Sequence, residues 1–190
     1  MVMKRLKAIA ASFLACATMI SATACGGFKV IDDEDVFFDA LDNTVSIDED
    51  ETYHQKNTTF NGDKVEYIIY TGDGDNFYTY IRFKKENDAM DMFDDFYQDF
   101  EEAKEDEDYQ GSHTMSMTKT RGYVIFNGEI EKDSSLNFFH VNQYFFEDSE
   151  IFGGVYVNGN VYIEAYSVNG SKRDKEKITN FLKELGFPKP

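Results

Sequence analysis

The feature that most constrains the fold is a hairpin signal at Asn158-Gly159. Runs of β-branched and aromatic residues, 155–157 and 161–168, flank this dipeptide. A type I′ turn needs positive φ at both central positions, which Asn and Gly accept. Ser171 then offers a hydroxyl that can cap a helix, and apolar residues recur at helical spacing after it. The sequence therefore predicts a hairpin followed directly by a helix that ends near the C-terminus.

A second hairpin and helix are predicted earlier in the chain. The β-branched and aromatic runs 64–71 and 77–83 are separated by turn-forming Gly, Asp and Asn residues. A helix over 87–104 follows, because apolar residues recur there at steps of four and three and would line one face: Ala89, Phe93, Phe96, Phe100 and Ala103. The opposite face of this helix is acidic, so we expect it to meet solvent.

The rest of the chain has weaker patterns. Residues 32–43 predict a short helix whose N-terminal acids suit the helix macrodipole. Residues 42–63 are polar and show no apolar period, which predicts a loop. Segments 114–119 and 123–127 predict two further strands. Aromatic residues are dense in 129–153, and we interpret this stretch as an inserted strand or a packed cover.

Together these elements predict a single α+β domain. Hairpins favour an antiparallel sheet, and the amphipathic helices favour two or three helices packed on one face of it. The tripeptides at 76–78 and 160–162 each read Asn, an apolar residue and Tyr, and each opens the second strand of a hairpin-helix unit. This similarity suggests an internal duplication of the unit.

The first 24 residues have the plan of a secretory signal. A basic start at 1–7 precedes an apolar run at 8–20, and the small residues 22–24 lie directly before Cys25. The apolar run is shorter than the roughly 20 residues that a membrane-spanning helix needs. We therefore expect a signal peptide at 1–24, a lipidated N-terminus and tether at 25–31, and one domain at 32–190. The alternative is an ordinary secretion signal with an incidental cysteine.

Charge and cysteine content limit the function further. Residues 1–24 hold Lys4, Arg5 and Lys7 and no acid, so their removal changes the formal charge from -17 to -17 - 3 = -20. Such an excess of acids argues against nucleic acid as a partner, because phosphate binding needs a basic surface. Once Cys25 is modified, the chain after it has no thiol for a disulfide, a metal site or a nucleophile. Stability is then expected to come from burial of the many Phe and Tyr side chains.

The segment Ala22-Thr23-Ala24-Cys25 resembles the lipobox of bacterial lipoproteins, with Ala22 in place of the usual Leu. The resemblance implies that Cys25 carries a diacylglycerol, becomes the new N-terminus and receives fatty acid such as palmitate. With the acid-capped helix, the pair Asp88-Ala89 and a final Leu-Gly-Phe at 185–187, the chain resembles small uncharacterised lipoproteins of Gram-positive bacteria. This resemblance implies attachment to the outer face of the cell membrane and an α+β domain, and it carries no catalytic residues.

No cofactor or metal site is predicted. Asp73 and Asp75 resemble the start of an EF-hand calcium loop, but its fifth and twelfth positions fall on Phe77 and Lys84. Weak calcium association with acidic loops at 48–51 or 105–108 stays open. The chain has no G-x-S-x-G motif and no phosphate-binding loop, so we assign no catalytic residue.

A row of tyrosines is the one candidate binding surface. If the valines and isoleucines of the predicted hairpins face the helices, alternation places Tyr78, Tyr80, Tyr162 and Tyr166 on the other side of the sheet. Apolar rings with hydroxyl tips suit a protein, peptide or glycan partner. Residues 129–153 could instead cover this face and make it a second core.

Three functions are compatible with these features. The first is a membrane-anchored, non-catalytic binding module, and the second is an envelope hydrolase that uses paired carboxylates. The third is an acidic spacer that binds cations weakly.

Overall fold

The computed structural model describes residues 28–132, 134, 136, 138, 139 and 149–190. The predicted signal, Cys25 and residues 140–148 of the aromatic stretch lie outside these residues. The elements in chain order are α1 Glu34–Val45, the short 3₁₀ helix η1 Glu49–Glu51, β1 Tyr53–Phe60, β2 Asp63–Asp73, β3 Asn76–Phe83, α2 Glu86–Glu105, β4 Tyr109–Met117, β5 Arg121–Ile130, β6 Ser149–Asn158, β7 Val161–Ser167 and α3 Lys172–Glu184.

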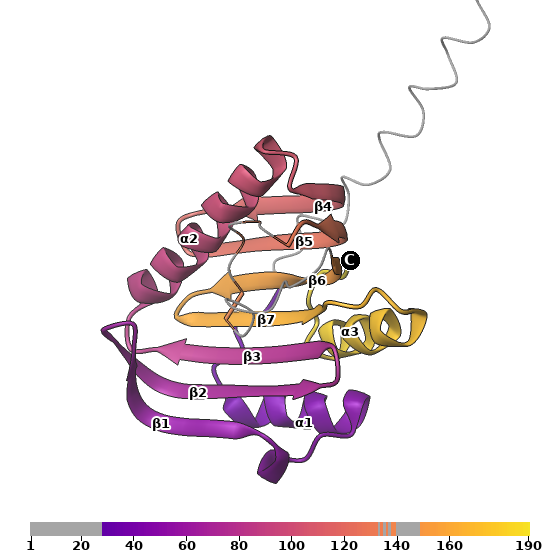
Figure 1. Ribbon diagram of the computed structural model, residues 1–190. Coiled ribbons are helices and arrows are strands. Elements are labelled where there is room, and N and C mark those ends of the chain that lie inside the picture. Colours follow the sequence, from indigo (N-terminus) through magenta and orange to yellow (C-terminus); the bar gives the residue numbers. More distant parts are fainter. Residues whose placement is uncertain (1–27, 133, 135, 137, 140–148) are drawn as a thin grey trace, which may run out of the picture.

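All seven strands form one antiparallel sheet in the order β1-β2-β3-β7-β6-β5-β4 (Figure 1). Strands β1 to β3 make one meander and β4 to β7 make another, and the two join where β3 pairs with β7. A helix follows each meander, α2 after β3 and α3 after β7. The predicted α+β class and both predicted hairpin-helix units are confirmed.

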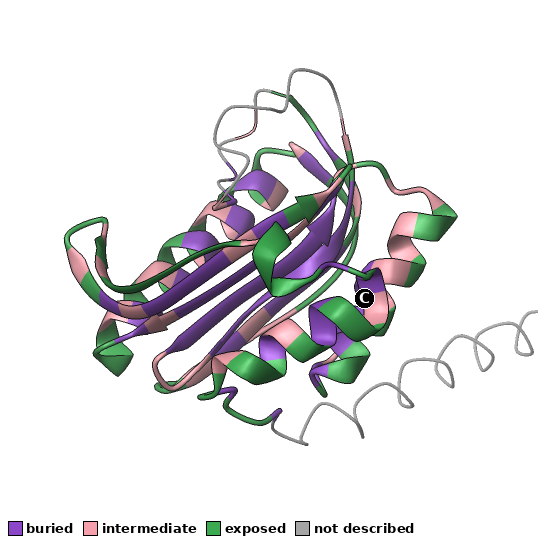
Figure 2. Ribbon diagram, turned by 90° about the horizontal axis from the view of Figure 1, so that it is seen from below, coloured by how far each residue is buried: buried purple, intermediate pink, exposed green. Residues whose placement is uncertain are grey.

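Helices cover both faces of the sheet. On one face, which we call the α1/α3 face, the rings of Phe37 and Phe181 meet edge to face with centroids 5.3 Å apart. The other, the α2 face, buries Phe93, Phe96 and Phe100. Two helices thus pack together on one face, as predicted, and the third occupies the opposite side. Because both sides are covered, every residue of β7 is buried, and its neighbours β3 and β6 are buried over most of their length (Figure 2).

The predicted loop at 42–63 is wrong over its second half, which forms strand β1. This strand lies at the edge of the sheet and pairs only with β2 among the described residues, and its side chains are mostly exposed. Asn57 has a φ of 51° and is left out of the paired residues, so the pairing with β2 is interrupted there without a change of register. A strand with neither side deeply buried shows no apolar alternation, and the sequence pattern therefore did not reveal it.

The aromatic stretch contributes both a strand and a cover, as interpreted. Its last residues begin β6, which pairs Ser149 with Ile130. Leu136 and Phe138 are buried against the α2 face, where the Phe138 ring stacks on Tyr166 with centroids 4.1 Å apart. Leu136 and Phe138 therefore belong to the core.

The predicted ends of α3 are confirmed. The backbone N–H of Asp174 donates to the Ser171 hydroxyl at 3.2 Å, which caps the first turn. Gly186 has a φ of 75°, and the N–H of Phe187 donates back to the carbonyl of Leu182 at 2.8 Å. This turn buries the Phe187 ring against the α1/α3 face.

Close packing of α2 on β5 leads to a prediction at Gly122. A Cβ at this position would overlap Cε1 of Phe93 and lie 2.8 Å from its Cζ. We expect Gly122→Ala to lower the free energy of unfolding by about 1–3 kcal/mol, because the ring is fully buried and has little room to shift. Phe93→Leu removes the overlapping ring, so the double variant should lose less stability than the sum of the two single losses. Urea unfolding of the four proteins tests this coupling, and strict additivity would contradict it.

Candidate functional site

The four predicted tyrosines do not form one surface. Tyr78 and Tyr80 pack on the α1/α3 face, and Tyr162 and Tyr166 pack on the α2 face. Each is at most 1% exposed. Phe181 covers Tyr78 at a centroid distance of 4.8 Å, and Phe138 covers Tyr166. The prediction of a common tyrosine binding face is therefore wrong for these residues.

The error lies in the pairing between β3 and β7. Alternation within each strand was assigned correctly, since Tyr78 and Tyr80 do share a face. Across the two strands, however, Tyr80 lies opposite Ile163 and Ile81 lies opposite Tyr162. Residues directly opposite each other point to the same side, and a shift of one residue reverses every side chain of a strand. The valine and isoleucine rows therefore divide between both faces.

The pairing instead places one acid, Glu164, at the centre of the α2 face. It is 0% exposed and lies in the middle of β7. The Tyr162 hydroxyl donates to its Oε1 at 2.7 Å, and the backbone N–H of Phe139 lies 3.2 Å from both carboxylate oxygens. The described part of the cover is thus bound to the strand through this carboxylate.

Burial changes the acidity of this group. Loss of hydration raises the pKa of Glu164 from its ordinary value to about 7, although the hydrogen bonds from Tyr162 and Phe139 favour the charged form and oppose the rise. The same burial, together with the neighbouring carboxylate, holds the pKa of Tyr162 well above its usual value. Glu164 can therefore gain or lose a proton near neutral pH.

Thr79 is the cross-strand neighbour of Glu164 on β3. Its hydroxyl is buried and has no hydrogen-bond partner among the described residues. No hydrogen bond joins this hydroxyl to the Glu164 carboxylate, although the two residues are paired across the strands. The sequence did not single out Glu164 as a site residue, because the chain has 36 acidic residues and nothing in their number favours one of them. The available signal was that it is the only charged residue within the apolar run 161–168.

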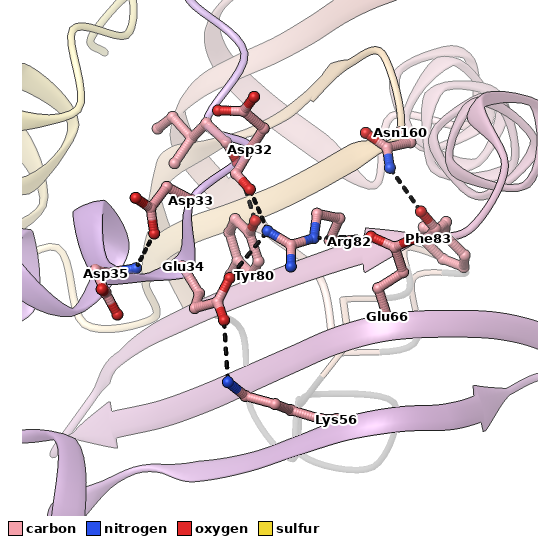
Figure 3. A network of polar contacts seen from close by, with 11 residues as sticks. Asp32, Asp33, Glu34, Asp35, Lys56, Glu66, Tyr80, Arg82, Phe83 and Asn160 are labelled. Carbon is pink, nitrogen blue, oxygen red and sulfur yellow. Dashed lines mark hydrogen bonds and ion pairs between the residues drawn. The ribbon is translucent and has the colours of Figure 1, made fainter.

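A second polar group fixes the start of the described chain on the sheet (Figure 3). Arg82 of β3 forms ion pairs with Glu34 at 2.9 Å and with Glu66 at 3.1 Å, and it donates to the carbonyl of Asp32. The Tyr80 hydroxyl donates to the carbonyl of Ile31 at 2.9 Å. These bonds hold the segment before α1 in place.

Further bonds extend this attachment to Phe28. The side-chain amide of Asn158 donates to the Phe28 carbonyl at 2.7 Å. The Phe28 ring is buried between Tyr156 and Phe187, at centroid distances of 5.8 and 4.8 Å. Residues 28–31, which sequence analysis assigned to a tether, are therefore packed on the folded domain.

A surface pocket of about 460 Å³ lies along α3, apart from the tyrosines and Glu164. It is lined by Gly170, Lys172, Lys175, Glu176, Thr179 and Asn180. The Lys175 ammonium already forms an ion pair, since its Nζ lies 2.6 Å from a carboxylate oxygen of Glu150. The pocket contains none of the residues selected from the sequence.

Neither a metal site nor a membrane span is found in the described residues. No group of three or more His, Cys, Asp or Glu side chains in this part of the chain could hold a metal ion. No helix within the same residues is long and apolar enough to cross a membrane. Comparisons with models of protein families, with curated proteins and with solved structures find no match for this chain.

Proposed function

We propose that this protein is a lipoprotein, anchored through Cys25 to the outer face of the cell membrane, whose folded domain is a non-catalytic binding module. The anchor follows from the basic start, the apolar run and the lipobox-like residues that precede Cys25. The partner of the domain would be a protein, a peptide or a glycan. The two parts of the proposal, anchor and binding, are tested separately.

The attachment of residues 28–34 carries the anchoring part of the proposal. Only Gly26 and Gly27 separate Cys25 from Phe28 in the sequence, and Phe28 is buried and hydrogen-bonded to β6. A lipid on Cys25 would therefore hold the domain close to the bilayer surface, because the three Cα–Cα steps from Cys25 to Phe28 span at most about 11 Å. Hydrogen bonds from Tyr80, Arg82 and Asn158 attach this segment to the sheet. The lipid would therefore be joined to the folded domain through a chain segment that is itself fixed in position.

The binding part is supported by the surface near strand β4. This edge strand is exposed from Gln110 to Thr114 and carries no charged side chain, in a chain of which 29% is charged. The hydrolase alternative is supported less well. It needs two carboxylates that reach a substrate from solvent, whereas Glu164 is fully buried and its hydrogen-bond partners are a phenol and a backbone amide.

Replacing Cys25 by alanine is the test of the anchor. We expect Cys25→Ala to abolish incorporation of labelled palmitate and to lower the membrane-bound share of the protein by about tenfold or more, because two acyl chains provide stable attachment. Metabolic labelling and fractionation of expressing cells measure both effects. Cys16→Ala, within the predicted signal, is the matched control and should change neither. Membrane attachment that survives in Cys25→Ala would rule out the lipid anchor.

A further inference from the structure

Strand β4 is an edge strand without the usual protection against further pairing. Its nine residues, Tyr109–Met117, include no Lys, Arg, Asp, Glu or Pro, and all nine pair with β5 without a register shift. The other edge strand, β1, has an interruption in its pairing at Asn57, where φ is 51°, and carries Lys56. Proteins normally block exposed edges with charges, prolines or bulges, because a free edge recruits another strand.

The hydrogen bonds at the ends of β4 show which of its backbone groups point away from β5, the one strand with which it pairs in the described part of the chain. The N–H of Thr118 donates to the carbonyl of Arg121, and the N–H of Glu131 donates to the carbonyl of Asp108. In an antiparallel pair, residues that bond to the neighbouring strand alternate with residues that point away from it. The even-numbered residues of β4 therefore face β5, and Gly111, His113 and Met115 direct their N–H and C=O groups outward.

The two sides of this edge differ in charge. On the α2 face, His113 packs against Phe100 with centroids 5.9 Å apart, and Lys104 lies 3.5 Å from the sulfur of Met115. The end of α2 and the turn into β4 bring acids beside these residues: Glu101, Glu102, Glu105, Asp106, Glu107 and Asp108. Lys104 is the one basic residue in this group and is paired with Glu101 at 2.6 Å. On the α1/α3 face the edge presents Ser112, Thr114 and Ser116.

We propose that β4 binds an extended peptide segment of a partner protein as an eighth strand, and that the segment carries Lys or Arg at alternate positions. The outward backbone groups of Gly111, His113 and Met115 would bond to the peptide backbone. Alternate peptide side chains would then point to the acidic α2 side, and the remaining ones to the hydroxyl-bearing side. This inference rests on the proposed binding role and does not depend on the lipid anchor.

Charge favours such a peptide over a second copy of this chain. Antiparallel pairing of two β4 strands would bring two acidic α2 ends to the same face of the joined sheet. Each copy carries a net charge of -17 before signal removal. Repulsion between like charges opposes that arrangement, and a basic peptide removes it.

The test uses the purified full-length protein in detergent and a capped nine-residue peptide of alternating Thr and Lys. We expect saturable binding by isothermal calorimetry that weakens as salt is raised, because the contacts on the acidic side are exposed ion pairs. A peptide with Glu in place of Lys, and a Lys peptide with alternate backbone amides N-methylated, should each bind at least about tenfold more weakly. Equal binding of the N-methylated peptide would overturn strand addition.

Variants of the protein separate the contribution of backbone hydrogen bonds to peptide binding from the contribution of surface charge. His113→Pro removes an outward N–H without removing a bond to β5, so the fold should survive while affinity falls by about tenfold or more. His113→Ala keeps the N–H and should bind as the parent does. Glu105→Lys should weaken binding several-fold, and Asp50→Lys, in η1 beside the other edge, is the matched control that should not.

Other outcomes would overturn the inference. Absence of binding at millimolar peptide would contradict it, as would a dimer seen in sedimentation that His113→Pro dissociates, since the edge would then be occupied by a second copy. If His113→Pro does not fold, the N-methylated peptide still decides the question. Binding by Cys25→Ala should equal that of the parent, so failure of this inference is distinguishable from failure of the anchor.

Discussion

Replacing Glu164 by glutamine should raise the free energy of unfolding at pH 8 by up to about 3 kcal/mol. The carboxylate of Glu164 is fully buried, and loss of hydration raises its pKa to about 7. Glutamine keeps an oxygen that can accept from the Tyr162 hydroxyl and from the Phe139 N–H. It has no charge to desolvate.

The sign of the effect follows from proton binding. Between the ordinary glutamate pKa of 4.5 and a value of about 7, the folded protein binds more protons at this site than the unfolded chain does. Stability from this group is therefore fully present below about pH 4.5 and is lost as pH rises to about 7. The advantage of Glu164→Gln should consequently be largest above pH 7 and close to zero near pH 4.

Thermal unfolding of both proteins across this pH range measures the difference. At about 2–4 °C per kcal/mol, the melting temperature of Glu164→Gln should exceed that of the parent by about 6–12 °C at pH 8. Glu129→Gln, which changes an exposed acid on strand β5 of the same sheet, is the control and should show no such pH-dependent gain. A gain that is the same at pH 4 and pH 8 would show that burial of charge is not its cause.

Replacing Phe181 by alanine should be the most damaging single change, lowering the free energy of unfolding by about 3–5 kcal/mol. The ring is 0% exposed and contacts both Phe37 of α1 and Tyr78 of β3. Its loss leaves a cavity where α1, α3 and the sheet meet. Because domain stabilities are about 5–15 kcal/mol, the variant should be partly unfolded at growth temperature.

Urea unfolding measures the loss directly. Lys183→Ala, an exposed residue in the last turn of the same helix, should change stability by no more than about 0.5 kcal/mol. Phe181→Leu fills most of the space and should lie between the parent and the alanine variant. A loss for Phe181→Ala as small as that of Lys183→Ala would mean that the α1/α3 contact contributes little.

Much of the fold was predictable because its signals are local. The stripe of α2 at Ala89, Phe93 and Phe96 marks its buried side within one helix. Ser171 caps α3 through an atom only three residues away. Strand β1 was not predicted, since an edge strand with exposed side chains shows no alternation of apolar and polar residues.

The candidate site was much less predictable. The tyrosines were assigned correctly within β3 and within β7, but their common face depended on how those two strands pair. One helix and three strands lie between Tyr80 and its cross-strand partner Ile163 in the sequence. No local pattern specifies that register, and an offset of one residue was enough to divide the tyrosines between two faces.

By itself, the sequence determined the hairpins, the helices and their buried stripes and the acidic charge, and it carries the lipobox-like residues on which the proposed anchor rests, because each of these is read from neighbours within a few residues. The tertiary structure alone decided that Glu164 is buried, that Phe28 is held on the sheet and that β4 is an edge strand of the sheet formed by the described residues. These three features depend on contacts between residues far apart in the chain, which are set by strand order and register.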